Sequence, residues 1–172
     1  MVPTSFQPLY FKWFNLRTYL FAFLFIAGNI LLPQLCHLIP SGGPMLLPVY
    51  FFTLIAAYKF GWKVGLLTAV LSPLVNSALF GMPPVAALPV ILIKSCLLAV
   101  AASLVAYRSG KVSLLLILLV LVAYQIPGSL AEWLITKNFN AALADLTIGI
   151  PGILLQLLGG WIVLKKLAKY ER

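Results

Sequence analysis

The sequence alternates between long apolar runs and short breaks that carry charged residues, glycine or proline. The runs cover about Thr18–Leu35, Met45–Tyr58, Val64–Phe80, Val85–Tyr107, Val112–Ile135 and Ile148–Leu164. A helix needs about 20 apolar residues to cross ~30 Å of hydrocarbon. The pattern therefore predicts an all-α membrane protein, built as a bundle of about six transmembrane helices.

The second, third and sixth runs are shorter than this norm, and each contains a proline. Short or interrupted helices are tolerated in membranes where they border a protein-lined cavity. Such helices can start inside a protein-lined cavity.

Composition excludes a soluble protein. Of the 172 residues, 63% are hydrophobic and only 9% are charged, whereas soluble domains carry roughly a quarter charged residues. The runs and their short connections occupy the whole chain, which predicts a single integral membrane domain over residues 1–172.

No small-residue cleavage site follows the first run, so we expect it to be a retained helix and not a signal peptide.

The positions of the basic residues predict the orientation of the bundle in the membrane. The formal net charge is +9, and most basic residues fall at the same ends of the runs. These residues are Lys12, Arg17, Lys59, Lys63, Arg108, Lys111, Lys165, Lys166, Lys169 and Arg172. Because cytoplasmic loops are rich in Lys and Arg, both termini are expected to be cytoplasmic. A basic chain can also bind nucleic acid, but charges confined to helix ends do not favour a nucleic-acid partner.

Lys94 is the most informative polar residue, because it lies about ten residues into the fourth run. A lysine at mid-membrane costs roughly 2.5–3.5 kcal/mol on insertion scales. It should therefore face a cavity and meet an anion, supplied either by a substrate or by an acidic side chain such as Glu132. A substrate role favours a ligand with a carboxylate or phosphate.

Other polar residues are predicted to gather in the outer half of the bundle. Together with Lys94, the candidate substrate-binding residues are Asn76, Glu132, Gln125, His37, Asn138 and Gln156. This distribution predicts a pocket open to the outside. The alternative for each amide is an interhelical hydrogen bond, which contributes about 0.6 kcal/mol on average.

Metal and catalytic chemistry have little support. Cys36 and His37 are adjacent and could ligate a soft metal, but no third ligand is evident, and we expect neither a metal nor another cofactor. No nucleophile–base set, HExxH motif or phosphate-binding glycine loop is present. The sequence therefore does not favour an enzyme.

Small residues recur at helical spacing in two places. They are Gly61, Gly65 and Ala69 in the third run, and Thr18 and Ala22 in the first. Small residues allow membrane helices to approach closely. These faces could contact a partner protein or pack within the chain.

Three stretches resemble the substrate-binding S component of energy-coupling factor (ECF) vitamin transporters. Phe60–Gly65 with the following run resembles the family's charged turn and glycine-rich third helix, Gly43–Pro48 its first outer loop, and Pro151–Gln156 its sixth helix. The family's AxxxA contact motif in helix one is absent, and Thr18 and Ala22 are the small residues in its place.

The resemblance implies a function. It implies a multi-pass subunit in the cell membrane of a prokaryote that binds a vitamin or precursor in an outward pocket. It also implies partners, namely a membrane coupling protein and two cytoplasmic ATPases that hydrolyse ATP. Two other functions stay open: a scaffold without a ligand, and a small intramembrane enzyme that acts on a lipid or isoprenoid with Glu132 or His37 as base.

Overall fold

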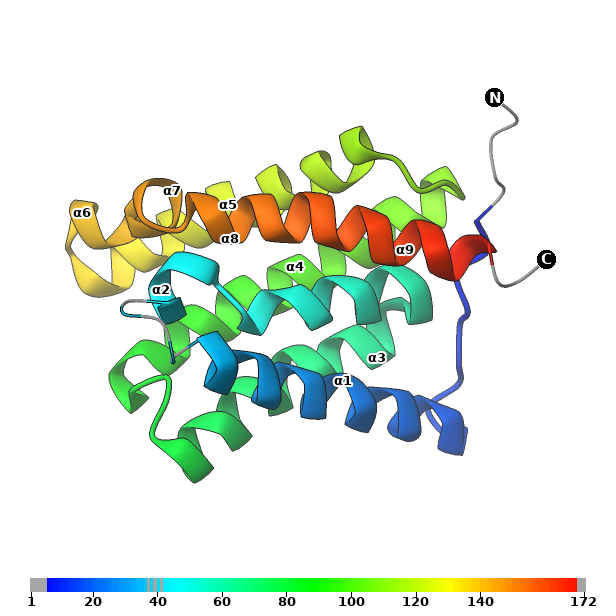
Figure 1. The fold of residues 1–172 in the computed structure, drawn as a ribbon, viewed down its shortest axis with the longest axis horizontal. Coiled ribbons are helices and arrows are strands. Elements are labelled where there is room, and N and C mark those ends of the chain that lie inside the picture. Colours follow the sequence, from blue (N-terminus) through cyan, green and yellow to red (C-terminus); the bar gives the residue numbers. More distant parts are fainter. Residues whose placement is uncertain (1–5, 37, 39, 41, 170–172) are drawn as a thin grey trace.

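The computed structural model describes residues 6–36, 38, 40 and 42–169, and every regular element among them is a helix (Figure 1). These are α1 (Leu16–Cys36), α2 (Gly42–Leu46), α3 (Val49–Phe80), η1 (Val85–Ala87), α4 (Leu88–Ser109), α5 (Leu114–Thr136), α6 (Phe139–Ala142), α7 (Ala144–Thr147), α8 (Ile150–Leu154), η2 (Leu155–Gly159) and α9 (Gly160–Lys169). Five helical stretches are long and apolar enough to cross a membrane, namely 16–36, 42–80, 85–109, 114–136 and 150–169. The predicted all-helical fold is confirmed, and these five stretches indicate a multi-pass membrane protein.

The longest helix, α3, is a hairpin of two arms. Gly61 has φ 81° and ψ 176°, a backbone conformation that is open essentially only to glycine. A Cβ placed on Gly65 would lie 2.5 Å from the Cβ of Ala57, although eight residues span about 12 Å along a straight helix. The chain therefore folds back at Gly61, and residues 49–60 and 62–80 lie side by side.

A buried asparagine of α1 joins both arms of this hairpin. The Asn29 Nδ2 group donates to Thr53 Oγ1 at 3.0 Å and to Ser72 Oγ at 3.2 Å, and the Phe52 amide donates to Asn29 Oδ1 at 3.3 Å. Positions 53 and 72 would be about 28 Å apart in one continuous helix. The polar network thus holds the two arms together in an apolar bundle, where each such bond contributes about 0.6 kcal/mol.

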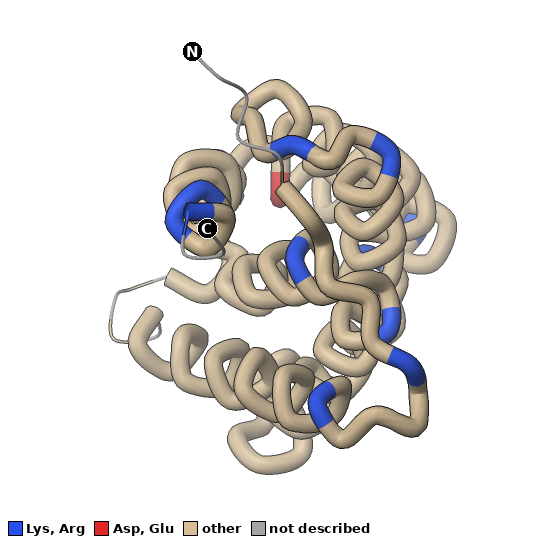
Figure 2. Tube along the Cα trace, turned by 90° about the vertical axis from the view of Figure 1, so that its right-hand side faces the viewer, with Lys and Arg blue, Asp and Glu red and all other residues tan. Residues whose placement is uncertain are grey.

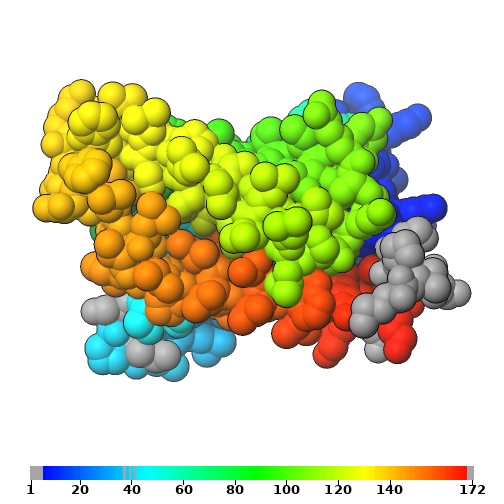
Figure 3. Space-filling view, turned by 90° about the horizontal axis from the view of Figure 1, so that it is seen from above, coloured from blue at the N-terminus to red at the C-terminus, as the bar shows by residue number. Residues whose placement is uncertain are grey.

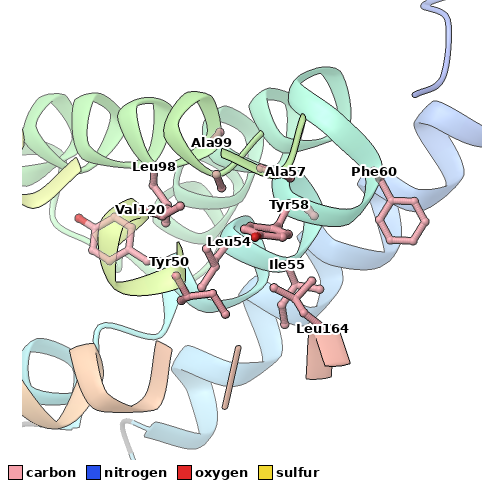
Figure 4. Packing of buried hydrophobic residues seen from close by; sticks show 14 of the residues in the cluster. Tyr50, Leu54, Ile55, Ala57, Tyr58, Phe60, Leu98, Ala99, Val120 and Leu164 are labelled. Carbon is pink, nitrogen blue, oxygen red and sulfur yellow. The ribbon is translucent and has the colours of Figure 1, made fainter. Parts of the chain in front are cut away.

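The first arm of α3 is the centre of the core (Figure 4). Residues 54–60 are all at most 7% exposed, as expected for a helix that is enclosed on every side. Leu98 of α4, Val120 of α5 and Leu164 of α9 belong to the same cluster. A Cβ on Gly160 would lie 2.9 Å from the Leu54 side chain, so the start of α9 packs directly on this arm.

The five small residues proposed as partner contacts lie inside the protein. Thr18, Ala22, Gly61, Gly65 and Ala69 are all buried. The proposal of a partner surface is therefore corrected, because these residues allow the chain's own helices to approach one another and none is available on the outside. The five residues instead pack within the chain, which was the other possibility left open by the sequence.

The turns that carry most of the basic residues lie together at one end of the bundle, which Figure 2 views face-on. We call this the basic end. Residues 6–12 cross it: the Phe6 amide donates to the Gly110 carbonyl at 2.9 Å, and the Leu9 amide to that of Lys59 at 2.7 Å. The end of α9 lies there as well (Figure 1).

The last third of the chain forms one face of the bundle. Figure 3 shows α5 running beside α8 and α9 across this face. Between them, α6 and α7 turn the chain back at the end opposite the basic end. This connection brings an acidic residue, Asp145, next to helices that are distant from it in sequence.

Candidate functional site

A cleft of about 700 Å³ lies at the end of the bundle opposite the basic end. It is bordered by the end of α1, by α2 and the start of α3, by the segment from Met82 to Ile91, and by α5 and α7. Five prolines line it, and the polar lining residues are Tyr50, Asn76, Lys94, Glu132, Thr136 and Asp145.

A cluster of three charged side chains, a buried lysine between two partly buried carboxylates, forms the charged part of the cleft lining. The Lys94 Nζ atom is 2.5 Å from Glu132 Oε2 and 2.7 Å from Asp145 Oδ2. The Lys94 side chain is 2% exposed, compared with 18% for Glu132 and 16% for Asp145. The Lys94 ammonium therefore links α4 to the last turns of α5 and to the first turn of α7.

One face of α5 is shaped to receive this lysine. Gln125, Gly128 and Glu132 are three and four residues apart, and residues at these spacings lie on one side of a helix. A Cβ on Gly128 would lie 2.7 Å from Lys94 Cγ, so the lysine stem occupies the space that a side chain would fill. Gln125 Nε2 donates to Asp145 Oδ2 at 3.2 Å and fixes the second carboxylate.

The cluster carries a formal charge of −1, from one ammonium and two carboxylates. The sequence left open whether Lys94 meets a substrate or an acidic side chain, and the structure pairs it with two acidic side chains. The expectation of an acidic ligand depended on an ammonium in need of an anion. With the ammonium satisfied by the protein, that argument no longer holds.

Asn76 places an unsatisfied amide group at this site. Asn76 lines the cleft and is 1% exposed. Its Oδ1 accepts from Gln34 Nε2 at 3.2 Å, while its Nδ2 has no hydrogen-bond partner among the described residues. Gln125 Oε1 is also buried without a partner among the described residues, but Gln125 does not line the cleft. An unsatisfied buried amide is costly, and the Nδ2 group of Asn76 belongs to a residue that a ligand in the cleft contacts.

Gln156 lies behind the cleft wall. It is fully buried in η2, a π-helical turn, and its Oε1 accepts from the Tyr124 hydroxyl at 3.1 Å. The Tyr124 ring packs against that of Tyr50, which lines the cleft, with centroids 5.7 Å apart. Gln156 therefore supports the lining and is not itself part of it.

Two other candidates are not placed in the cleft. Asn138 is exposed and caps α6, since its Oδ1 accepts from the Ala141 amide at 3.1 Å. His37 lies outside the described residues, so the Cys36–His37 pair is not seen, and Cys36 itself is buried at the end of α1. No group of three or more His, Cys, Asp or Glu side chains that could hold a metal occurs in the described part of the chain.

Asp145 is the site residue that the sequence did not single out. It lies in the polar connection between the fifth and sixth runs, outside every predicted helix. Counting charges could have identified Asp145 from the sequence. The chain has three acidic residues, and two of them are predicted to lie on the same side of the bundle as the buried lysine. A lysine in a membrane helix is expected to pair with such groups.

Comparison of the chain with known protein families, with curated proteins and with solved structures found no match to any of them.

Proposed function

We propose that this protein binds a small molecule in the cleft from outside the cell and serves as the substrate-binding subunit of a membrane uptake system. The observation that carries the proposal is the cleft itself. It combines an apolar, proline-rich wall with a charged cluster around the buried Lys94 and the unsatisfied amide of Asn76, the usual make-up of a site for a small organic ligand.

The proposal includes six membrane crossings with both chain ends in the cytoplasm. The two arms of α3 count as separate crossings. The first arm spans only about 18 Å at 1.5 Å per residue, but it is enclosed by other helices and need not match the lipid thickness. The basic end is assigned to the cytoplasm by the positive-inside rule, so the cleft opens to the exterior.

The kind of uptake system follows from the resemblance to ECF S components. Under this proposal a membrane coupling protein and two cytoplasmic ATPases supply the energy, the ligand is a vitamin or its precursor, and the protein resides in the cell membrane of a prokaryote. Charged groups within a membrane bundle commonly mark a substrate path, which favours transport over a purely structural scaffold.

Cysteine labelling tests the orientation. In a Cys36→Ala/Cys96→Ala background, Asn138→Cys is expected to react with a membrane-impermeant maleimide on intact cells, because Asn138 is exposed at the cleft end. Ser109→Cys, beside the Gly110 turn at the basic end, is expected to react only after permeabilisation. The reverse pattern would contradict the assignment of the cleft to the outside.

Ligand binding is tested on the purified full-length protein in lipid nanodiscs. Native mass spectrometry is expected to detect a co-purified small molecule. Ala87 lines the cleft, so Ala87→Trp is expected to abolish the bound species by filling the space. Ala78 is exposed on α3 outside the cleft lining, and Ala78→Trp is the matched control that should retain it.

The outcomes separate the possible functions. Equal occupancy in Ala87→Trp and Ala78→Trp would place the ligand elsewhere. A protein that never retains a small molecule, even after incubation with a cell extract, would favour the scaffold. Chemical turnover of a lipid would favour the enzyme.

A further inference from the structure

We propose that the ligand of the cleft is an organic cation, held through the carboxylates of Glu132 and Asp145. This inference rests on the proposed function, since it names the chemical class of the molecule bound at the same site. It reverses the preference for an acidic ligand that a lone lysine would create.

Exposure decides which charges a ligand meets. The Lys94 side chain is 2% exposed, whereas those of Glu132 and Asp145 are 18% and 16% exposed, so the carboxylates are the charged groups presented to the cleft. The hydrogen bonds to both carboxylates from the described residues go to Glu132 Oε2 and Asp145 Oδ2. Glu132 Oε1 and Asp145 Oδ1 remain as acceptors for a ligand ammonium, amidinium or protonated ring.

Charge balance leads to the same class of ligand. Lys94, Glu132 and Asp145 are the formally charged residues that line the cleft in the described part of the chain, and their sum is −1. An anion would add a second surplus negative charge in a region of low dielectric, which is strongly unfavourable. A monovalent cation would bring the site to neutrality.

The rest of the site indicates what the cation carries. Asn76 Nδ2 is an unpartnered buried donor on a residue that lines the cleft, so it suits a ligand acceptor such as a carbonyl or ring nitrogen. Tyr50, Val90 and Ile91 supply apolar and aromatic surface, on which a flat body can pack. The structure therefore favours a compact heterocycle with one positive charge and one acceptor.

Fractionated metabolites test this inference on the wild-type protein. Small molecules from a cell extract are separated into cation-exchange-retained, anion-exchange-retained and unretained fractions. The protein in nanodiscs is incubated with each fraction, washed and analysed by native mass spectrometry. Only the cation-exchange fraction is expected to yield a bound species.

Each outcome has a definite meaning. A species bound from the anion-exchange or unretained fraction would overturn the cation inference and leave the proposed function standing. No species from any fraction would overturn both. A species from the cation-exchange fraction alone supports both.

Two isosteric variants then test the role of the carboxylates. Glu132→Gln and Asp145→Asn each bring the formal charge of the cluster to zero, and each is expected to weaken binding of the recovered cation by about tenfold or more. Lys137→Gln is the control, because Lys137 is exposed at the same end and does not line the cleft, and its affinity should stay within about twofold of wild type. If one variant fails to give a monodisperse protein, the other decides, and unchanged affinity in a folded variant would overturn the inference.

Discussion

Gly65→Leu is expected to prevent formation of the α3 hairpin and to leave little folded protein. A Cβ at this position would lie 2.5 Å from Ala57 Cβ and 2.8 Å from Ala57 Cα. The second contact is with backbone, so no rotation of a side chain can relieve it. Overpacking a core usually costs about 1–3 kcal/mol, and we expect Gly65→Leu to exceed this range because the two arms must separate along the buried centre of the bundle.

Size-exclusion chromatography and thermal unfolding of the purified protein measure the effect. Ala78→Leu, a small-to-large change at an exposed position of the same arm, is the matched control and should behave like the wild type. A monodisperse Gly65→Leu protein with unchanged thermal stability would contradict the close approach of the two arms and would favour a continuous α3.

Much of the fold could be predicted because membrane helices are encoded mainly by apolar length. The first run, Thr18–Leu35, became α1, Leu16–Cys36, and the fifth run, Val112–Ile135, became α5, Leu114–Thr136. The helical stretch formed by α8, η2 and α9 continues past the predicted end of the sixth run, to Lys169. Hydropathy falls at the terminal lysines, but lysine is a good helix former and its charge is favourable near a helix C-terminus.

The turn between the second and third runs was predicted as a charged break, and its actual geometry is tighter. A single non-helical residue, Gly61, reverses the chain, while Lys59 and Lys63 stay within the helical arms. Periodicity marks where apolar character is interrupted. It does not show that one glycine with positive φ suffices for the reversal.

The site was only partly accessible from the sequence. A buried lysine requires an anion, so the pairing of Lys94 with Glu132 could be proposed as an alternative. Asp145 reaches the same ammonium because α6 and α7 fold the connection back over the cleft, and that path depends on tertiary packing. Asn138 is the opposite case, a predicted site residue that does not lie in the cleft. An asparagine in a polar loop is suited equally to a ligand contact and to a helix cap, so the sequence does not distinguish the two roles.

Lys94→Met is expected to destabilise the protein by about 3–5 kcal/mol, the usual cost of removing one partner from a buried ion pair. Methionine replaces the apolar stem of lysine without the terminal ammonium, so the space beside Gly128 stays filled. What is lost is the charge that lies between Glu132 and Asp145. Two partly buried carboxylates would then repel each other without a counter-ion. Unfolding by SDS in mixed micelles measures the change in free energy.

A variant that lacks all three charges separates the electrostatic effect of Lys94→Met on stability from its effect on packing. The triple variant Lys94→Met/Glu132→Gln/Asp145→Asn removes all three charges, and it should recover most of the lost stability, because no uncompensated carboxylate is left in the bundle. Lys137→Met, at an exposed lysine of the same end, should change stability by less than about 0.5 kcal/mol. If Lys94→Met alone were as stable as wild type, Lys94 could not be the buried counter-ion of the two carboxylates. Without that pairing Lys94 would again be an ammonium in need of an anion, and an acidic ligand would be favoured. The stability of one variant therefore bears directly on the chemistry assigned to the cleft.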